Sequence, residues 1–269
     1  MTNDEGPGEI LENSFRFAAS NVKSLAIWGI AFTLAIIVMM VVLFAGILLF
    51  HDDIIVMLVL MLLSYIPVIA VTVLLMGFVC QCLKTVLGGG RVMPTGLESP
   101  GDLVKDGIVI SIILLEAVVL IIVLFLPIYA FMILAGPGNI ALMLAAMGLM
   151  LLAIPVTMLI YFVNVIQWAV YADTGSLLQG LNPLKAIGLI ASNWRGAAVT
   201  ALLLFAASIV FSIIMFVCEI FIVTILLLPF LMVAMYPCMA YIIAVFYRQS
   251  RGDRPNDIRD AVTGGYSVT

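Results

Sequence analysis

The strongest constraint on the fold is a set of long apolar runs with almost no charge. Residues 24–50 and 54–83 carry no charged side chain, and residues 107–172 and 196–247 carry a single acidic residue each. A membrane-spanning helix needs about 20 apolar residues at a rise of about 1.5 Å per residue. These runs therefore predict helices that cross a lipid bilayer.

The composition supports a membrane protein. Hydrophobic residues make up 65% of the 269 residues and charged residues only 10%, whereas a soluble domain carries about 25% charged residues. This balance excludes a soluble globular enzyme and a disordered chain. The net charge of −4 argues against binding to nucleic acid, which requires a basic surface.

The two longest runs are too long for one span each and must fold back. Gly136-Pro137-Gly138-Asn139 breaks the first of them with strong turn residues, and the second is expected to turn near Glu219. We therefore predict an all-α membrane protein with six spans, at about residues 24–50, 54–83, 107–134, 141–170, 196–218 and 222–247.

The basic residues indicate how these spans are oriented. With six spans, all eleven Lys and Arg fall within residues 1–23, 84–106, 173–195 and 248–269, on one side of the membrane. The positive-inside rule then places both termini in the cytoplasm, in a multi-pass protein of the cell membrane. The expected organisation, in chain order, is a cytoplasmic N-terminal segment over 1–23, a membrane domain over 24–248 and a polar cytoplasmic tail over 249–269.

Two short amphipathic segments precede spans and predict interfacial helices. Residues 10–18 lead into the first span and residues 183–190 into the fifth. The sequences that follow them, Ala19-Ser-Asn-Val-Lys23 and Ala191-Ser-Asn-Trp-Arg195, are related and suggest a parallel two-fold repeat. The polar residues of these two sequences are candidate contacts for lipid headgroup phosphates, or alternatively plain interfacial stop signals: Asn21, Lys23, Asn193 and Arg195.

One acidic residue is expected deep in the bilayer. Glu116 lies ten residues beyond Asp106, which corresponds to about 15 Å of helix. An ionised carboxylate at that depth is costly and needs polar partners. Asn164 lies at a similar depth in the next span, and Gln167 follows it by one turn. We expect these three side chains to form a cluster, either as interhelical glue or as a proton or solute relay.

The sequence offers no pattern for catalysis, a cofactor or a metal. The Cys80-x-Cys82 pair has no second ligand pair, and His51 is the only histidine. A zinc site needs about four such ligands. No candidate nucleophile is accompanied by a general base. We therefore expect no catalytic residues, no bound cofactor and no metal site.

Three stretches carry a resemblance to a known family. They are Leu62-Leu-Ser-Tyr-Ile-Pro67 with the following Gly88-Gly89 and Pro94, Tyr171-Ala-Asp-Thr-Gly-Ser-Leu177 with Asn193, and Leu228-Pro-Phe230 with the following Tyr241 and Phe246-Tyr-Arg-Gln249. Together they resemble an uncharacterised prokaryotic membrane family, domain of unknown function 4013, common in archaea. The resemblance covers about residues 8–250, and it implies an all-helical membrane fold without a known chemistry.

These observations favour a non-enzymatic integral membrane protein. We expect a subunit that binds a partner or organises the membrane, with recognition through membrane faces or cytoplasmic loops. The alternative is a transporter or channel for a small solute or ion that uses Glu116. The expected partners are membrane lipids and a protein, without nucleic acid.

Overall fold

The regular structure is helical throughout the part of the chain that the structure describes. This is a computed structural model that describes residues 6–50, 53–135, 139–220 and 227–252. The helices are α1 Pro7–Ala19, α2 Val22–Phe50, α3 Ile54–Ser64, α4 Ile66–Leu87, α5 Pro100–Ala135, α6 Ile140–Thr174, α7 Leu177–Gly180, α8 Pro183–Ser192, α9 Trp194–Ile220 and α10 Leu228–Arg251.

The prediction of an all-α protein with six apolar spans is confirmed. Six helical segments are long and apolar enough to cross a membrane, with α3 and α4 together forming the second of them. The short break between α3 and α4 falls at Tyr65, just before Pro67 in the first turn of α4, where a missing N–H costs no helical hydrogen bond. The expected turns at 51–52 and 136–138, the start of the expected span at 222–247 and nearly all of the tail lie outside the described residues.

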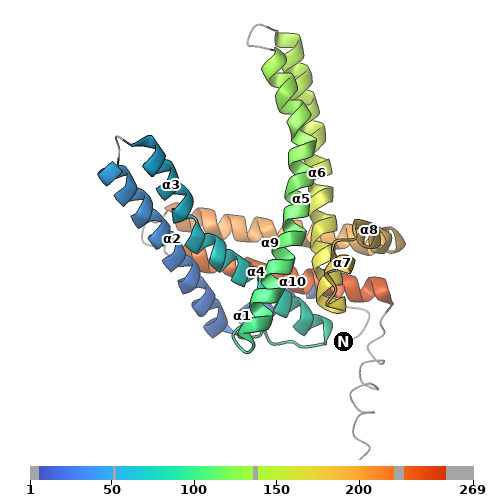
Figure 1. Cartoon of the computed structure of the whole chain (residues 1–269). Helices are drawn as coiled ribbons and strands as arrows, with labels where there is room; N and C mark the ends of the chain where they lie inside the picture. The colour runs from blue at the N-terminus through green and yellow to red at the C-terminus, as the bar shows by residue number, and fades with distance from the viewer. Residues whose placement is uncertain (1–5, 51–52, 136–138, 221–226, 253–269) are drawn as a thin grey trace, which may run out of the picture.

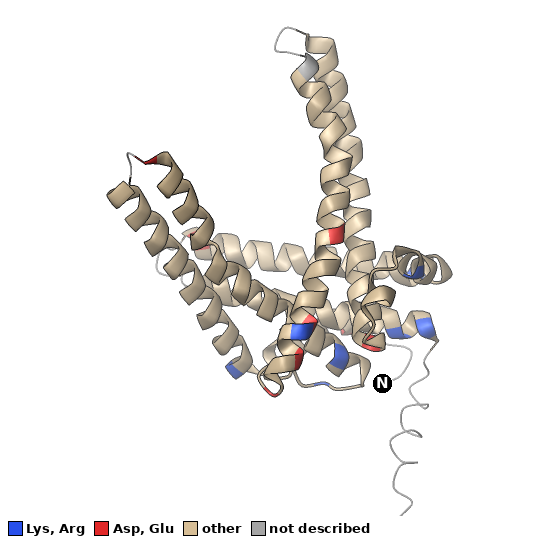
Figure 2. Cartoon of the chain, in the orientation of Figure 1, with Lys and Arg blue, Asp and Glu red and all other residues tan. Residues whose placement is uncertain are grey.

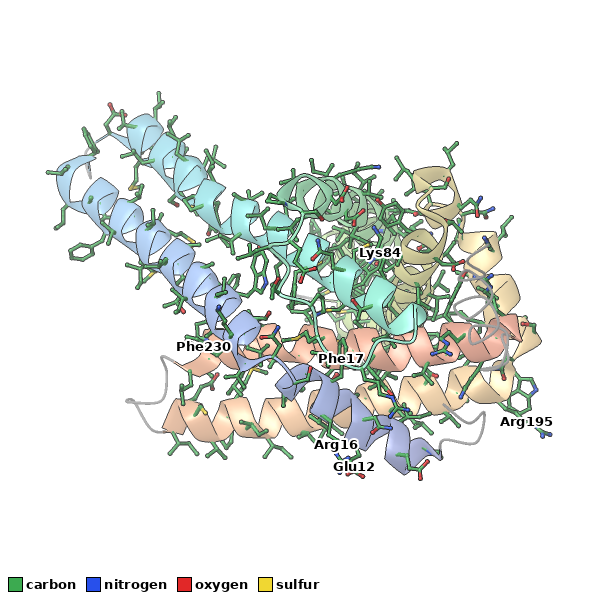
Figure 3. The ribbon with its side chains drawn as sticks, turned by 90° about the horizontal axis from the view of Figure 1, so that it is seen from below. Glu12, Arg16, Phe17, Lys84, Arg195 and Phe230 are labelled. Carbon is green, nitrogen blue, oxygen red and sulfur yellow. The ribbon has the colours of Figure 1, made fainter. Side chains whose placement is uncertain are left out.

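The long helices form three hairpins that diverge from a shared base. The first hairpin is α2 with α3 and α4, the middle one α5 with α6, and the last one α9 with α10. Figures 1 and 3 show the last hairpin lying crosswise to the middle one, with the first hairpin pointing away from both. Most buried residues belong to the base, which comprises residues 75–87, 100–113, 164–174 and 233–247.

Two glycines allow the closest helix crossing in the base, between α4 and α5. A Cβ atom on Gly77 would overlap the carbonyl oxygen of Leu103, and one on Gly107 would overlap the carbonyl oxygen of Val73. The two backbones are therefore in direct contact, as small residues permit between membrane helices.

The amphipathic segment 10–18 forms α1, but protein rather than lipid covers its apolar face. α1 packs against α10 and touches α9, and Phe17 is 1% exposed, with its ring 5.7 Å from that of Tyr241. The opposite face of α1 carries an exposed ion pair between Glu12 and Arg16, which points away from the other helices in Figure 3. The second amphipathic segment forms α8, which packs mainly against α6.

The basic residues gather at one end of the molecule. Figure 2 shows the described Lys and Arg residues around the base, while the upper parts of the first and middle hairpins carry none of them. We call this end of the molecule the basic end. The clustering of the basic residues agrees with the pattern that the positive-inside rule predicts from the sequence.

Candidate functional site

The three residues expected to form an intramembrane cluster come together between α5 and α6. Gln167 Nε2 donates a hydrogen bond to Glu116 Oε2 at 3.2 Å. Asn164 Nδ2 donates to the carbonyl oxygen of Ile113 at 2.7 Å and lies 3.4 Å from Gln167 Oε1. The antiparallel packing of α5 and α6 sets this depth match, because each helix advances by the same rise per residue.

The burial of this cluster is uneven. Asn164 and Gln167 are 1% and 2% exposed, whereas Glu116 is half-buried. Asn164 Oδ1 is buried and has no hydrogen-bond donor among the described residues. A buried acceptor without a donor is uncommon and costs free energy. The cluster can hold a carboxyl group in an apolar region, and it leaves one acceptor free for a further donor.

A second cluster, which the sequence analysis missed, joins three helices at the basic end. Asp106 is 3% exposed; its Oδ2 lies 2.5 Å from Lys84 Nζ, and its Oδ1 accepts a hydrogen bond of 2.8 Å from the Tyr171 hydroxyl. The ammonium group also lies 6.0 Å from the centre of the Tyr171 ring. We call these three residues the Asp106 clamp, since they tie α4, α5 and α6 together.

The sequence held only a weak signal for this clamp. Lys84 and Asp106 are the charged residues nearest to two apolar runs, one at the end of a run and one just before the next. Such positions are usually assigned to solvated loop ends. That their side chains meet, and that Tyr171 joins them, depends on the crossing of α4 and α5.

A third polar contact ties α6 to α10 at the same end. Asp173 Oδ2 accepts hydrogen bonds from the Tyr247 hydroxyl at 3.0 Å and from Arg251 Nη1 at 2.6 Å. As in the Asp106 clamp, an aspartate at the basic end of one helix binds a tyrosine and a cation. Charge-assisted hydrogen bonds of this kind are stronger than neutral ones, so these contacts fix the relative positions of four helix ends.

The two asparagines of the proposed repeat, Asn21 and Asn193, make equivalent hydrogen bonds to the backbone three residues further on. Asn21 Oδ1 accepts a hydrogen bond from the backbone N–H of Ser24, and Asn193 Oδ1 accepts one from that of Gly196, both at 3.1 Å. Each asparagine thereby caps the long helix that follows it. Their amide nitrogens bind protein as well, the carbonyl oxygen of Met93 for Asn21 and Ser250 Oγ for Asn193.

The loop after α4 is attached to the first of these caps. Met93 N donates to Ser20 Oγ at 2.8 Å, and Ser24 Oγ donates to the carbonyl oxygen of Pro94 at 2.8 Å. Met93 itself is 1% exposed. The loop between α4 and α5 is thus hydrogen-bonded to the junction of α1 and α2.

The two basic residues proposed as headgroup contacts lie on the surface. Lys23 and Arg195 are both exposed, and the Arg195 guanidinium lies 5.5 Å from the centre of the Trp194 ring. Their positions at the basic end leave them accessible to lipid phosphates, and their role as headgroup contacts stays a prediction.

The described cysteines do not gather into a ligand set. Cys80, Cys82 and Cys238 are buried and unpaired, and within the described residues no three His, Cys, Asp or Glu side chains are grouped to hold a metal ion. His51 lies outside the described residues.

The six apolar helices and the segregated charges define a multi-pass helical membrane protein. Residues 59–220 match the family model described as protein of unknown function, DUF4013. The chain therefore belongs to this family, and the resemblance inferred from the sequence is confirmed. No curated protein and no solved structure matches the chain.

Proposed function

We propose that the protein is a non-enzymatic component of the cell membrane that binds a partner protein through its diverging hairpins. The supporting observation is the exposure of the arms, which we define as the described residues of 36–64 and 118–157. In α3, Leu58, Val59, Met61, Leu62 and Leu63 are all exposed. Because successive residues of a helix differ by about 100°, these positions cover about half of the circumference of α3, while Leu60 on the opposite side contacts Gly46 of α2.

Such exposure suits a helix that meets other membrane helices. A span inside a finished bundle is covered by neighbouring helices on several sides. The outer parts of α3 and α6 each pack against one helix, α2 and α5 respectively, and their other sides offer apolar side chains, with Leu62 72% exposed and Leu152 68% exposed. Lipid can cover these faces, and so can the helices of a partner.

The arrangement we propose places both termini in the cytoplasm. Its support is the gathering of the described Lys and Arg at the basic end (Figure 2), which the positive-inside rule assigns to the cytoplasmic side. Fusions of a periplasmic-active and a cytoplasmic-active reporter to residue 269 give opposite signals and test this orientation directly.

Site-specific photo-crosslinking tests the partner. A photoreactive amino acid at Leu62 or Leu152 is expected to give one discrete protein adduct in native membranes, reproduced when the identified protein is co-expressed and purified with this chain. The same probe at Leu184, which is 75% exposed but lies on α8 at the base, provides the matched control. Adducts with lipid alone at both arm positions would overturn the proposal.

A transporter or channel is the second candidate, and the intramembrane cluster favours it. Asn164 Oδ1 lacks a donor beside the half-buried Glu116 carboxylate, as in a site that exchanges a proton or binds a small solute. In a Glu116→Cys variant, rapid labelling by a water-soluble maleimide from one side supports transport. Protection from both sides supports the partner-binding component.

A further inference from the structure

An apolar groove of about 510 Å³ runs between α6 and α9, and residues of α4 and α10 also line it. Trp168 of α6 and Leu202 of α9 lie on its two walls, and Ile243 of α10 and Val79 of α4 lie on its floor. α10 packs against both α6 and α9, whereas α6 and α9 have almost no direct contact with each other. We call this feature the α6–α9 groove.

The chemistry of the lining limits what can occupy the groove. No charged side chain lines it, and it lies between segments that are apolar enough to span a membrane. A hydrophilic solute would lose its hydration there and gain few polar partners, chiefly the hydroxyl groups of Tyr161, Tyr236 and Ser208. The volume falls within the range of roughly 300–1,000 Å³ that small-molecule sites occupy. A hydrocarbon chain is the ligand that matches both the lining and the surroundings.

Basic residues lie on helices that form the groove or pack against those helices. α8, which carries Lys185, packs against α6, α9 and α10, the helices that supply both walls and part of the floor. Lys185 Nζ donates one hydrogen bond to Gln179 Oε1 at 2.8 Å, and an ammonium group has two further donors.

Arg195 lies near the start of α9, before the residues of that helix that line the groove. It precedes Leu202 by seven residues, which places the two side chains on one helical face and separates them by about 10 Å along the axis. The nearest acid on α6, Asp173, binds Tyr247 and Arg251. Its charge is therefore already matched and does not cancel that of Arg195.

We propose that the α6–α9 groove binds an anionic phospholipid of the leaflet at the basic end. One hydrocarbon chain lies in the groove, and the phosphate lies at Arg195 and Lys185. The geometry separates the two parts of the ligand by about two helical turns, as in a phospholipid with its headgroup at the interface and its chain in the bilayer. The site is independent of the partner proposed for the arms.

Native mass spectrometry of the full chain, released from nanodiscs of phosphatidylglycerol and phosphatidylcholine in equal amounts, tests this site. The protein is expected to retain phosphatidylglycerol with about 25-fold preference, since each of the two basic residues contributes about fivefold. Arg195→Gln is expected to lower the preference to about fivefold, and Arg195→Gln combined with Lys185→Gln to equality. Lys105→Gln, at an exposed lysine on α5, is the matched control and keeps the full preference.

A second pair of variants tests the hydrocarbon part. Ala201 lines the groove and is exposed, so Ala201→Trp fills the groove without entering the protein core. It is expected to lower retention of both lipids about tenfold, whereas Ala145→Trp, at an exposed alanine on the outer part of α6, changes nothing. Unchanged retention in Ala201→Trp overturns the proposal. So does a dimer that Ala201→Trp dissociates, because a second copy would then occupy the groove.

Discussion

The base and the arms of this molecule are built from similar apolar residues but differ in what surrounds them. In α10, 50% of the most apolar stretch is buried inside the protein, against 6% in the segment formed by α3 and α4. The base also holds the Asp106 clamp and the Asp173 contact, while the described residues of the arms contain no ion pair. Packing among several helices therefore constrains the residues of the base, whereas in the arms most apolar side chains are open to lipid or to the proposed partner.

This contrast explains where polar residues are tolerated. In the base, Asp106 and Asp173 each have a cation and a tyrosine hydroxyl as partners, and the small residues allow helices to cross closely. In the arms, each helix packs against one neighbour, and lipid can cover its other sides, since lipid chains are as apolar as leucine. Substitutions in the base should therefore change stability far more than equivalent substitutions in the arms.

The largest effect is expected at the crossing of α4 and α5. Gly77→Ala places a methyl group against the Leu103 backbone and is expected to cost about 3 kcal/mol, because the two helices must move apart. Gly148→Ala on the arm of α6, where nothing lies within 4 Å of the added carbon, should cost nothing. Thermal unfolding in detergent micelles measures both, and equal losses would contradict the contrast between base and arms.

A smaller loss is expected at the Asp106 clamp. Asp106→Asn removes the ion pair with Lys84 and weakens the acceptor for Tyr171, for an expected cost of about 2 kcal/mol, moderated because Lys84 can reach water. Glu12→Gln breaks the exposed pair with Arg16, whose side chains are 60% and 75% exposed, and is expected to change the unfolding free energy by less than about 0.5 kcal/mol. A similar midpoint for both variants would show that the clamp is not stabilising.

The helix caps should rank next. Asn21→Ala is expected to cost slightly more than about 1 kcal/mol, because it removes the cap of α2 and the bond to Met93 together. Asn193→Ala removes the equivalent cap of α9 but only a long contact to Ser250, so it should cost about 1 kcal/mol or less. Chemical unfolding of the two variants side by side measures the difference, and the reverse order would argue against the loop contact.

The smallest effect is expected in the intramembrane cluster. If Glu116 serves only as interhelical glue, Glu116→Gln retains a side chain of the same shape and should cost about 0.6 kcal/mol, a typical value for a hydrogen bond between membrane helices. Glu219→Gln, at the exposed end of α9, is the control. Growth and expression measured together decide the role, because a lost phenotype at normal expression would assign Glu116 a function beyond glue.

The sequence alone determined the helices and the depth of their polar residues. Uncharged runs of known length require spans, and a fixed rise per residue sets Glu116 and Asn164 at one level. The proximity of these two residues could therefore be predicted by counting residues from the ends of two neighbouring spans. Asn21 and Asn193 were visible as a repeated pattern, which predicted headgroup contacts or interfacial stop signals, whereas the structure shows that both side chains cap helices and that their amides bind protein.

Only the tertiary structure decided how the spans pack. Lys84, Asp106 and Tyr171 come from three helices, and their meeting depends on the angle and register at which α4 crosses α5. In the same way, α1 has the amphipathic sequence of an interfacial helix, yet α10 covers its apolar face. Apolar side chains are about equally stable in contact with lipid and in contact with protein. Hydrophobicity therefore determines that a helix enters the membrane, and complementary shape determines which neighbour it meets there.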